Sequence, residues 1–297
     1  MKSWRHILAL VLALQCVLLS GARGDDRPLS PEEIRALVAR AVANQHRNDA
    51  MLEQYERIER RQIRRDHNDP RPITDKTFRV VPTGTGVVRV QTEENGRPVD
   101  AELYRKQLRD VEQALVFALR PDESRQKRAV EKNAKRVREH TEFLDVVPRA
   151  FLFTWLGREN HHGRARVKLA LEPNPEFHPA SRNQALLASV RATVWLDEEA
   201  AQVVRVEAEM TRDFSFGGGL VGKVYRGGRF VMEQAEAAPG IWLPTHYEYN
   251  FDGRKFLFSF GVHQRIEVSH YHRIGPPGEA LAAIRRELGG AAAASTP

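Results

Sequence analysis

The pattern of apolar and polar residues predicts a helix directly after Ser30. Its apolar positions recur three and four residues apart and form one stripe: Ile34, Leu37, Val38, Ala41 and Val42. Ser30 is a preferred N-cap residue, Pro31 suits the first helical position, and Glu33 completes a capping box. We expect the polar residues 44–48 to end or fray this helix.

A second helical block is expected at about residues 100–140. Its first half ends at Pro121 and carries a clean apolar stripe, which consists of Tyr104, Leu108, Val111, Leu115 and Leu119. The second half, residues 122–140, is crowded with lysine and arginine and contains few apolar residues. Two interpretations stay open for it: a solvated surface helix, or a loosely held lid or lipid-surface contact.

Most of the remaining chain has the composition and alternation of strands. Strands are expected at residues 76–81, 87–92, 151–155, 167–171, 190–196, 203–210, 221–226, 229–236, 242–251 and 255–271, and residues 55–65 fit either a helix or a long strand. Strict alternation in 203–210 indicates a sheet with one wet face. Asp252 and Gly253 are expected to form a hairpin turn. Hairpins in series predict an antiparallel meander that must curl, close or be covered.

The first 24 residues have the pattern of a cleavable secretory signal. Lys2 and Arg5 precede an apolar run at residues 7–19, and Ala22 and Gly24 supply small residues for cleavage near Gly24. The apolar run is shorter than the roughly 20 residues that span a bilayer. We therefore expect an exported protein, periplasmic or secreted, with at most peripheral membrane contact.

The expected mature chain is one domain, residues 25–274, followed by residues 275–297, a short helix at 279–288 and a disordered alanine-rich tail. Cys16, the only cysteine, lies in the signal, so disulfides and thiol chemistry are not expected after cleavage. Loss of the signal also removes three basic residues and lowers the formal charge from +7 to +4. Such a mild bias does not suggest a nucleic-acid partner, but it permits weak attraction to anionic lipid.

Known catalytic motifs are missing from the sequence. It contains no GxSxG nucleophile turn and no phosphate-binding glycine loop, and the glycine runs at 217–219 and 227–228 fit turns or strand kinks. His270 and His272 are spaced to share one strand face, and His246 lies on a neighbouring predicted strand. Because spacing fixes no third ligand or base, we predict no metal, no cofactor and no catalytic residue.

Aromatic residues alternate along two predicted strands and end a third. They are Phe151, Phe153 and Trp155, then Phe256, Phe258 and Phe260, and finally Trp195. The alternation places the three rings of each trio on one face of a sheet. An ordinary core beneath helices is one interpretation. The other is that these seven residues line a cavity for an apolar ligand.

Three longer strings carry a resemblance to a known family. They are FLFTWLGRENHHGRARVKLALEPNPEFHP, TVWLDEEAAQVVRVEAEM and YRGGRFVMEQAEAAPGIWLPTHYEYNF, at residues 151–179, 193–210 and 225–251. With the order of predicted elements, they resemble the LolA-like group, the periplasmic carriers of outer-membrane lipoproteins and their relatives. The resemblance spans about residues 25–274. It implies an α+β fold: a curled, unclosed antiparallel β-barrel with helices covering its concave face.

The predicted function combines this implied fold with the aromatic strands. We expect a non-enzymatic periplasmic or envelope protein that binds a lipid or a lipoprotein acyl chain in the concave face of the sheet. One alternative is an envelope sensor or scaffold that binds other envelope proteins without lipid. A second is a hydrolase whose site the motifs do not reveal.

Overall fold

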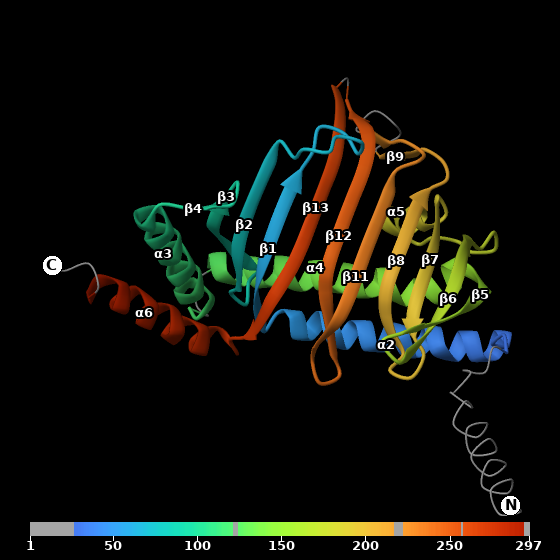
Figure 1. Cartoon of the computed structure of the whole chain (residues 1–297), viewed down its shortest axis with the longest axis horizontal. Helices are drawn as coiled ribbons and strands as arrows, with labels where there is room; N and C mark the ends of the chain where they lie inside the picture. The colour runs from blue at the N-terminus through green and yellow to red at the C-terminus, as the bar shows by residue number, and fades with distance from the viewer. Residues whose placement is uncertain (1–26, 121–123, 217–221, 257, 294–297) are drawn as a thin grey trace, which may run out of the picture.

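A single antiparallel sheet of 13 strands dominates the fold (Figure 1). The computed structural model describes residues 27–120, 124–216, 222–256 and 258–293, so the predicted signal at 1–24 lies outside the described residues. The strands are β1 (Tyr55–Ile63), β2 (Thr74–Pro82), β3 (Val87–Glu94), β4 (Arg97–Pro98), β5 (Phe151–His161), β6 (Arg164–Pro173), β7 (Val190–Asp197), β8 (Gln202–Met210), β9 (Phe214–Phe216), β10 (Gly222–Val224), β11 (Arg229–Ala238), β12 (Ile241–Lys255) and β13 (Phe258–Arg273).

The order of the strands shows that the sheet is open. It runs β4-β3-β2-β1-β13-β12-β11-β8-β7-β6-β5, with β10 paired to β12 and β9 paired to β10. β4 and β5 lie at opposite ends of this order, which confirms the prediction of an unclosed antiparallel barrel. β1 pairs with β13, so the first and last strands meet in the middle of the sheet.

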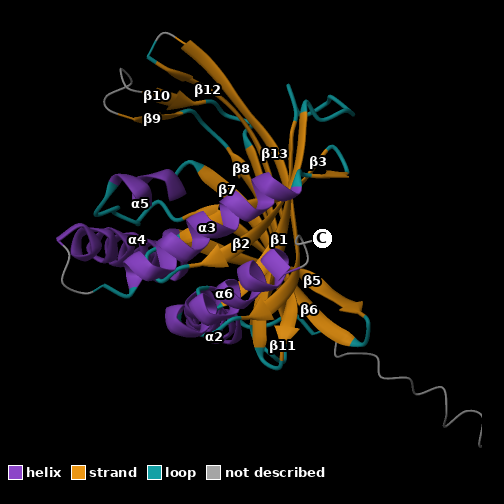
Figure 2. Cartoon of the chain, turned by 90° about the vertical axis from the view of Figure 1, so that its left-hand side faces the viewer, coloured by secondary structure: helices purple, strands orange, loops and turns teal. Residues whose placement is uncertain are grey.

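Five helices complete the α+β fold in the described residues, and their placement makes the two faces of the sheet different. They are α2 (Pro31–Leu52), α3 (Ala101–Ala118), α4 (Ser124–Ala150), α5 (Arg182–Leu187) and α6 (Pro277–Ala293). α2, α4 and α5 lie on one side of the sheet, and β9, β10 and the upper end of β12 lean out over that same side (Figure 2). We call this side the helical face and the other side the open face.

The main core lies between the helical face and helices α2 and α4. α2 contributes its predicted stripe, and strands β5 to β8 contribute the residues opposite it. Leu169 and Val194 are paired in register on β6 and β7 and are both buried in this core. The predicted capping box also forms, because Glu33 N donates to Ser30 Oγ over 3.2 Å and Ser30 N donates to Glu33 Oε2 over 2.7 Å. These contacts fix α2 across the lower half of the sheet.

A second core lies at the β2–β3 end of the sheet. Val81 and Val90 are fully buried there against Leu108 of α3 and Ile284 of α6. The strand register places Val81 on the open face, since neighbouring residues of a strand point to opposite faces and Val80 pairs with Arg57 on the helical face. α3 and α6 therefore cover one end of the open face.

α2 continues to Leu52, so the expectation that residues 44–48 would end it was wrong. Asn48 is 1% exposed, donates to Gln202 Oε1 over 2.8 Å and accepts a hydrogen bond from Trp242 N over 3.2 Å. A buried amide with its hydrogen bonds made is compatible with a core helix. The sequence gave no sign of these bonds, because both partners lie more than 150 residues away.

The expected hairpin turn at Asp252 and Gly253 was also wrong. Both residues lie inside β12, where Gly253 pairs with Phe260 of β13 and with Val224 of β10. A Cβ at Gly253 would collide with the backbone carbonyl of Lys223. Glycine at this position therefore serves the close approach of a neighbouring strand, which is the other common reason for glycine inside a strand.

Two helices, α4 in the predicted insert and α6 in the predicted tail, are longer than expected. α4 reaches Ala150, beyond the predicted end at 140, and α6 reaches Ala293, into the segment that was expected to be disordered. Alanine has the highest helix propensity, and Ile284 anchors α6 in the second core. Residues 294–297 lie outside the described residues. Over the part of the chain that is described, none of the helices is both long and apolar enough to cross a membrane.

Candidate functional site

A strip of aromatic side chains follows β11, β12 and β13 up the helical face. We define this aromatic strip as Phe230, Tyr247, Tyr249, Phe251 and Phe260. Its rings are neighbours: the centroid of Tyr249 lies 5.2 Å from that of Phe230 and 6.1 Å from that of Tyr247. Tyr247 pairs with Ile266 of β13, which is buried, so the lower end of the strip lies under the helices.

Burial decreases along the strip from bottom to top. Burial raises the pKa of Tyr247 well above its ordinary value, and it also raises the pKa of Tyr249. On the same face of β13, further up, Phe260 is 37% exposed and Val262 is 39% exposed. The strip thus runs from a water-poor lower end to an upper end where apolar surface is open to solvent. Open apolar surface of this kind is typical of binding sites.

Two glycines let the rings of the strip lie directly on the sheet. A Cβ at Gly228 would lie 2.5 Å from the ring of Phe251, and a Cβ at Gly253 would lie 2.6 Å from the ring of Phe260. Both rings therefore cover backbone that carries no side chain. A side chain at Gly228 or Gly253 would therefore displace the ring that lies over it.

A cluster of arginines adjoins the strip on β1 and β3. Glu59, 4% exposed, accepts hydrogen bonds from Arg57 Nε over 2.9 Å, from Arg61 Nη2 over 2.6 Å and from Arg89 Nε over 3.3 Å. Burial alone would raise the pKa of Glu59, but the three arginines outweigh it and hold that pKa below its ordinary value. With three guanidinium groups around one carboxylate, the cluster keeps an excess of positive charge beside Tyr249.

The structure separates the seven aromatic residues that the sequence singled out. Phe151, Phe153 and Trp155 of β5 pack in the main core with α2 and α4. Trp195 points to the open face, because its register partner is Lys168 and the lysine Nζ lies 4.8 Å from the ring centroid. These positions fit the core interpretation for β5 and a solvated cation–π contact for Trp195.

The second trio, Phe256, Phe258 and Phe260, differs from the first in its exposure to solvent. Phe258 is 77% exposed and Phe256 is 57% exposed at the far end of the β12–β13 hairpin, while Phe260 belongs to the aromatic strip. Phe258 and Phe260 offer apolar surface on the helical face, whereas Phe256 lies in the turn between β12 and β13, so the expected alternation of three rings on one strand was wrong for Phe256. The binding role of all seven residues stays a prediction.

Sequence reasoning missed most of the aromatic strip. Tyr247, Tyr249 and Phe251 alternate along β12 in the same way as the two trios, in the string HYEYNF. That alternation was a readable signal for a third aromatic strand. The position of Phe230 beside them could not be read, since it depends on the pairing of β11 with β12.

The candidate histidines do not converge on one point. His246 pairs with Glu233 and Glu267 on the open face, whereas His270 lies at an irregularity of β13 and has a left-handed φ of 52°. His272 pairs with Glu56 beyond that irregularity. Within residues 27–293, leaving out the undescribed positions, no three His, Cys, Asp or Glu side chains are grouped as metal ligands.

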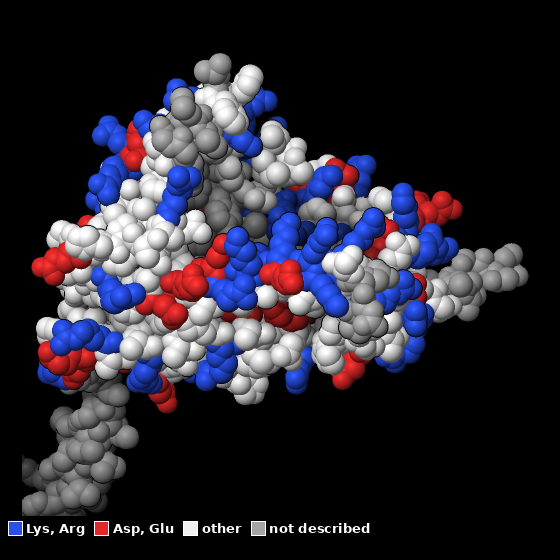
Figure 3. All heavy atoms as spheres, turned by 180° about the vertical axis from the view of Figure 1, so that it is seen from behind, with Lys and Arg blue, Asp and Glu red and all other residues white. Residues whose placement is uncertain are grey.

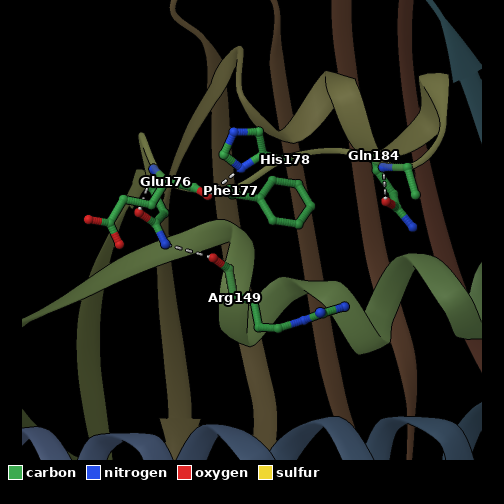
Figure 4. Close-up of a pocket in the computed structure, with 7 residues that line it drawn as sticks. Arg149, Glu176, Phe177, His178 and Gln184 are labelled. Carbon is green, nitrogen blue, oxygen red and sulfur yellow. Dashed lines mark hydrogen bonds between the residues drawn. The ribbon is translucent and has the colours of Figure 1, made fainter.

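A surface depression of about 430 Å³ lies where α4 ends and α5 begins (Figure 4). Its polar groups satisfy one another: Asn174 Nδ2 donates to the Arg149 carbonyl over 3.0 Å, and Ala180 N donates to Gln184 Oε1 over 2.8 Å. Phe177 packs toward the main core. These bonds shape a loop, and the depression contains no nucleophile paired with a base.

Basic side chains gather along α4 on the helical side of the molecule (Figure 3). Residues 124–140 hold seven lysines and arginines, all exposed, and two glutamates, Glu131 and Glu139. α4 is tied to α2 by polar contacts there, for example His140 Nε2 with Asp49 Oδ2 at 2.9 Å. The helix that crosses below the aromatic strip is thus strongly positive.

Comparisons with known proteins find likeness in solved structures alone. No protein-family model matches the chain, and no curated protein matches it. A Vibrio parahaemolyticus domain, named provisionally for outer membrane lipoprotein sorting, is 10% identical with a TM-score of 0.30, covering 79% of this chain and 92% of that domain. A DUF1329 family protein from Desulfovibrio piger is 14% identical with a TM-score of 0.26, covering 81% and 92%.

Proposed function

We propose that this chain is a non-enzymatic envelope protein that binds the acyl chain of a lipid or lipoprotein along the aromatic strip. The observation that carries the proposal is the strip itself: contiguous rings on the helical face that are buried at one end and open at the other. The predicted export signal supports a place in the cell envelope, where such ligands occur.

The dimensions of the strip suit an acyl chain. From Ile266, at the level of Tyr247, to Phe260, at the upper end of the strip, is six residues along β13, or about 20 Å at about 3.4 Å per residue. One leaflet of a bilayer holds hydrocarbon about 15 Å deep, half of the roughly 30 Å core. An extended acyl chain as long as one leaflet is deep is therefore shorter than the strip and fits along it.

The energetics favour an amphipathic ligand. Each methylene group that moves from water onto the rings contributes roughly 0.8 kcal/mol, so several buried groups outweigh the cost of ordering the chain. The arginine cluster next to Tyr249 supplies positive charge for an anionic head group. Arg61 and Arg89 are the suitable arginines, because their side chains are 27% and 37% exposed while that of Arg57 is only 10% exposed.

Binding of a fluorescent fatty acid to the mature chain tests this proposal. Phe260→Glu places a charge at the open upper end of the strip and should weaken binding at least about tenfold. Leu152→Glu is the matched control, because Leu152 is 52% exposed on the far edge strand β5 and points to the open face. Equal loss in both variants, or no loss in Phe260→Glu while the protein stays folded, would contradict the proposal.

A further inference from the structure

The β12–β13 hairpin ends in aromatic residues that no part of the described chain covers. β12 and β13 are 15 and 16 residues long, and their hairpin forms the upper end of the molecule (Figure 1). Phe256 and Phe258 are 57% and 77% exposed there. Phe256 also has a left-handed φ of 54°, an uncommon conformation for a bulky residue. The fold keeps the ring of Phe256 in water at a backbone position that an asparagine or glycine would adopt more easily.

The ring of Phe258 points to the same side as α4. The register of β12 and β13 runs without a break from Tyr247 with Ile266 to Lys255 with Phe258, and every second residue shares a face. Phe258 is thus on the helical face. Exposed cations accompany it, because Lys255 is its direct partner and Arg254 precedes it on β12.

A second patch on that side is positive and partly apolar. The first half of α4 exposes seven lysines and arginines, and it also exposes Val130 and Val137, at 41% and 46%. These valines are seven residues apart, so they lie on one stripe of the helix. A helix with exposed apolar residues among cations is typical of proteins that lie on anionic membrane surfaces.

We infer that the helical side of the protein docks on an anionic phospholipid bilayer, with Phe256 and Phe258 inserted into the interface and the basic half of α4 against the head groups. A bilayer suits two separate patches, because it is fluid and carries its negative charge over the whole surface. A folded protein partner would need matched acids opposite each patch. The inference goes beyond acyl-chain binding, since either activity can exist without the other.

Cosedimentation of the mature chain with vesicles tests the inference. Vesicles of phosphatidylglycerol and phosphatidylcholine should bind the protein, vesicles of phosphatidylcholine alone should bind it at least about tenfold more weakly, and raising salt from 0.1 to 0.5 M should reduce binding because surface charges are screened. Equal binding to both vesicle types, or no binding to either at low salt, would overturn the inference.

Variants assign the effect to the two patches. Phe258→Glu should lower vesicle binding about tenfold or more, whereas Leu152→Glu, at another exposed apolar position but on the open face, should leave it unchanged. For α4, the triple change Lys127→Gln, Lys132→Gln and Lys135→Gln should also lower binding about tenfold. The matched triple on α3 and α6, Lys106→Gln, Arg109→Gln and Arg286→Gln, should not.

The fluorescent fatty acid separates this inference from the proposed function. The α4 triple should lose vesicle binding and keep fatty-acid binding, whereas Phe260→Glu should lose fatty-acid binding. Vesicle binding that survives both Phe258→Glu and the α4 triple, in variants with unchanged melting temperature, would refute the docking surface. Loss of fatty-acid binding alone would leave it standing.

Discussion

The two aromatic trios, which look alike in sequence, should respond in opposite ways to truncation. Phe151 is 6% exposed in the main core, and Phe258 is 77% exposed at the hairpin end. Phe151→Ala should therefore destabilise the protein and leave its ligand surface intact. Phe258→Ala should change stability little and reduce binding to anionic vesicles.

The expected magnitudes follow from burial. Truncating a buried phenylalanine to alanine costs about 3–5 kcal/mol, which at roughly 2–4 °C per kcal/mol lowers the melting temperature by roughly 6–20 °C. Full burial of a phenylalanine side chain is worth roughly 1.5–3 kcal/mol, and less than a quarter of Phe258 is removed from water. Phe258→Ala should thus cost less than about 0.7 kcal/mol, or roughly 1–3 °C.

Thermal unfolding followed by circular dichroism, with vesicle cosedimentation on the same samples, measures both effects. A Phe151→Ala variant that melts like the parent but no longer binds ligand would refute the assignment of β5 to the core. Strong destabilisation by Phe258→Ala would show that this ring is packed, and the exposed hairpin end would then be wrong.

Three further predictions concern stability. Glu59→Gln should destabilise the fold by about 3–5 kcal/mol in urea unfolding, because three arginines lose their buried counter-charge; a change below about 1 kcal/mol would argue against the cluster. Gly253→Ala should lower the melting temperature, since its Cβ would collide with the Lys223 carbonyl, and an unchanged value would mean that β10 can move away. The hydrogen bond with Asp49 raises the pKa of His140 above 6.5, so the α2–α4 contact is strongest below pH 6.5 and is lost as pH rises through the higher folded pKa. Hydrogen exchange in α4, corrected for intrinsic rate, should be faster at pH 8 than at pH 6, and His140→Gln should remove that difference.

Periodicity in the sequence was sufficient to predict most of the longer elements of this fold, but not β4, β9 or α5. The stripe after Ser30 and the stripe from Tyr104 to Leu115 both became core faces of helices, because the burial of a helix follows its own 3.6-residue period. Leu119, the last predicted position of the second stripe, is 46% exposed just after α3. The strict alternation in residues 203–210 became β8, and hairpins in series became an open antiparallel sheet. The resemblance to the LolA-like group predicted the same curled arrangement.

Contacts with residues far away in the sequence decided the structural roles of Asn48 and Gly253, which the local sequence pattern could not predict. Asn48 looked like a helix end but is buried because Gln202 and Trp242 meet it. Gly253 looked like a turn but lies between two strands. In both cases a residue type has two common uses, and the choice between them depends on atoms from distant parts of the chain.

In the candidate site, too, the local sequence pattern predicted some features and contacts between distant segments decided the others. The sequence alone determined which strands carry alternating aromatic residues, since alternation fixes that the rings of one strand share a face. It could not determine that Phe151 is covered by helices, that Trp195 points to the opposite side, or that Phe258 is left in water. Those outcomes depend on strand order, on register and on where α2 and α4 cross the sheet, and only the tertiary structure sets these, because each arises from pairing between segments far apart in the chain.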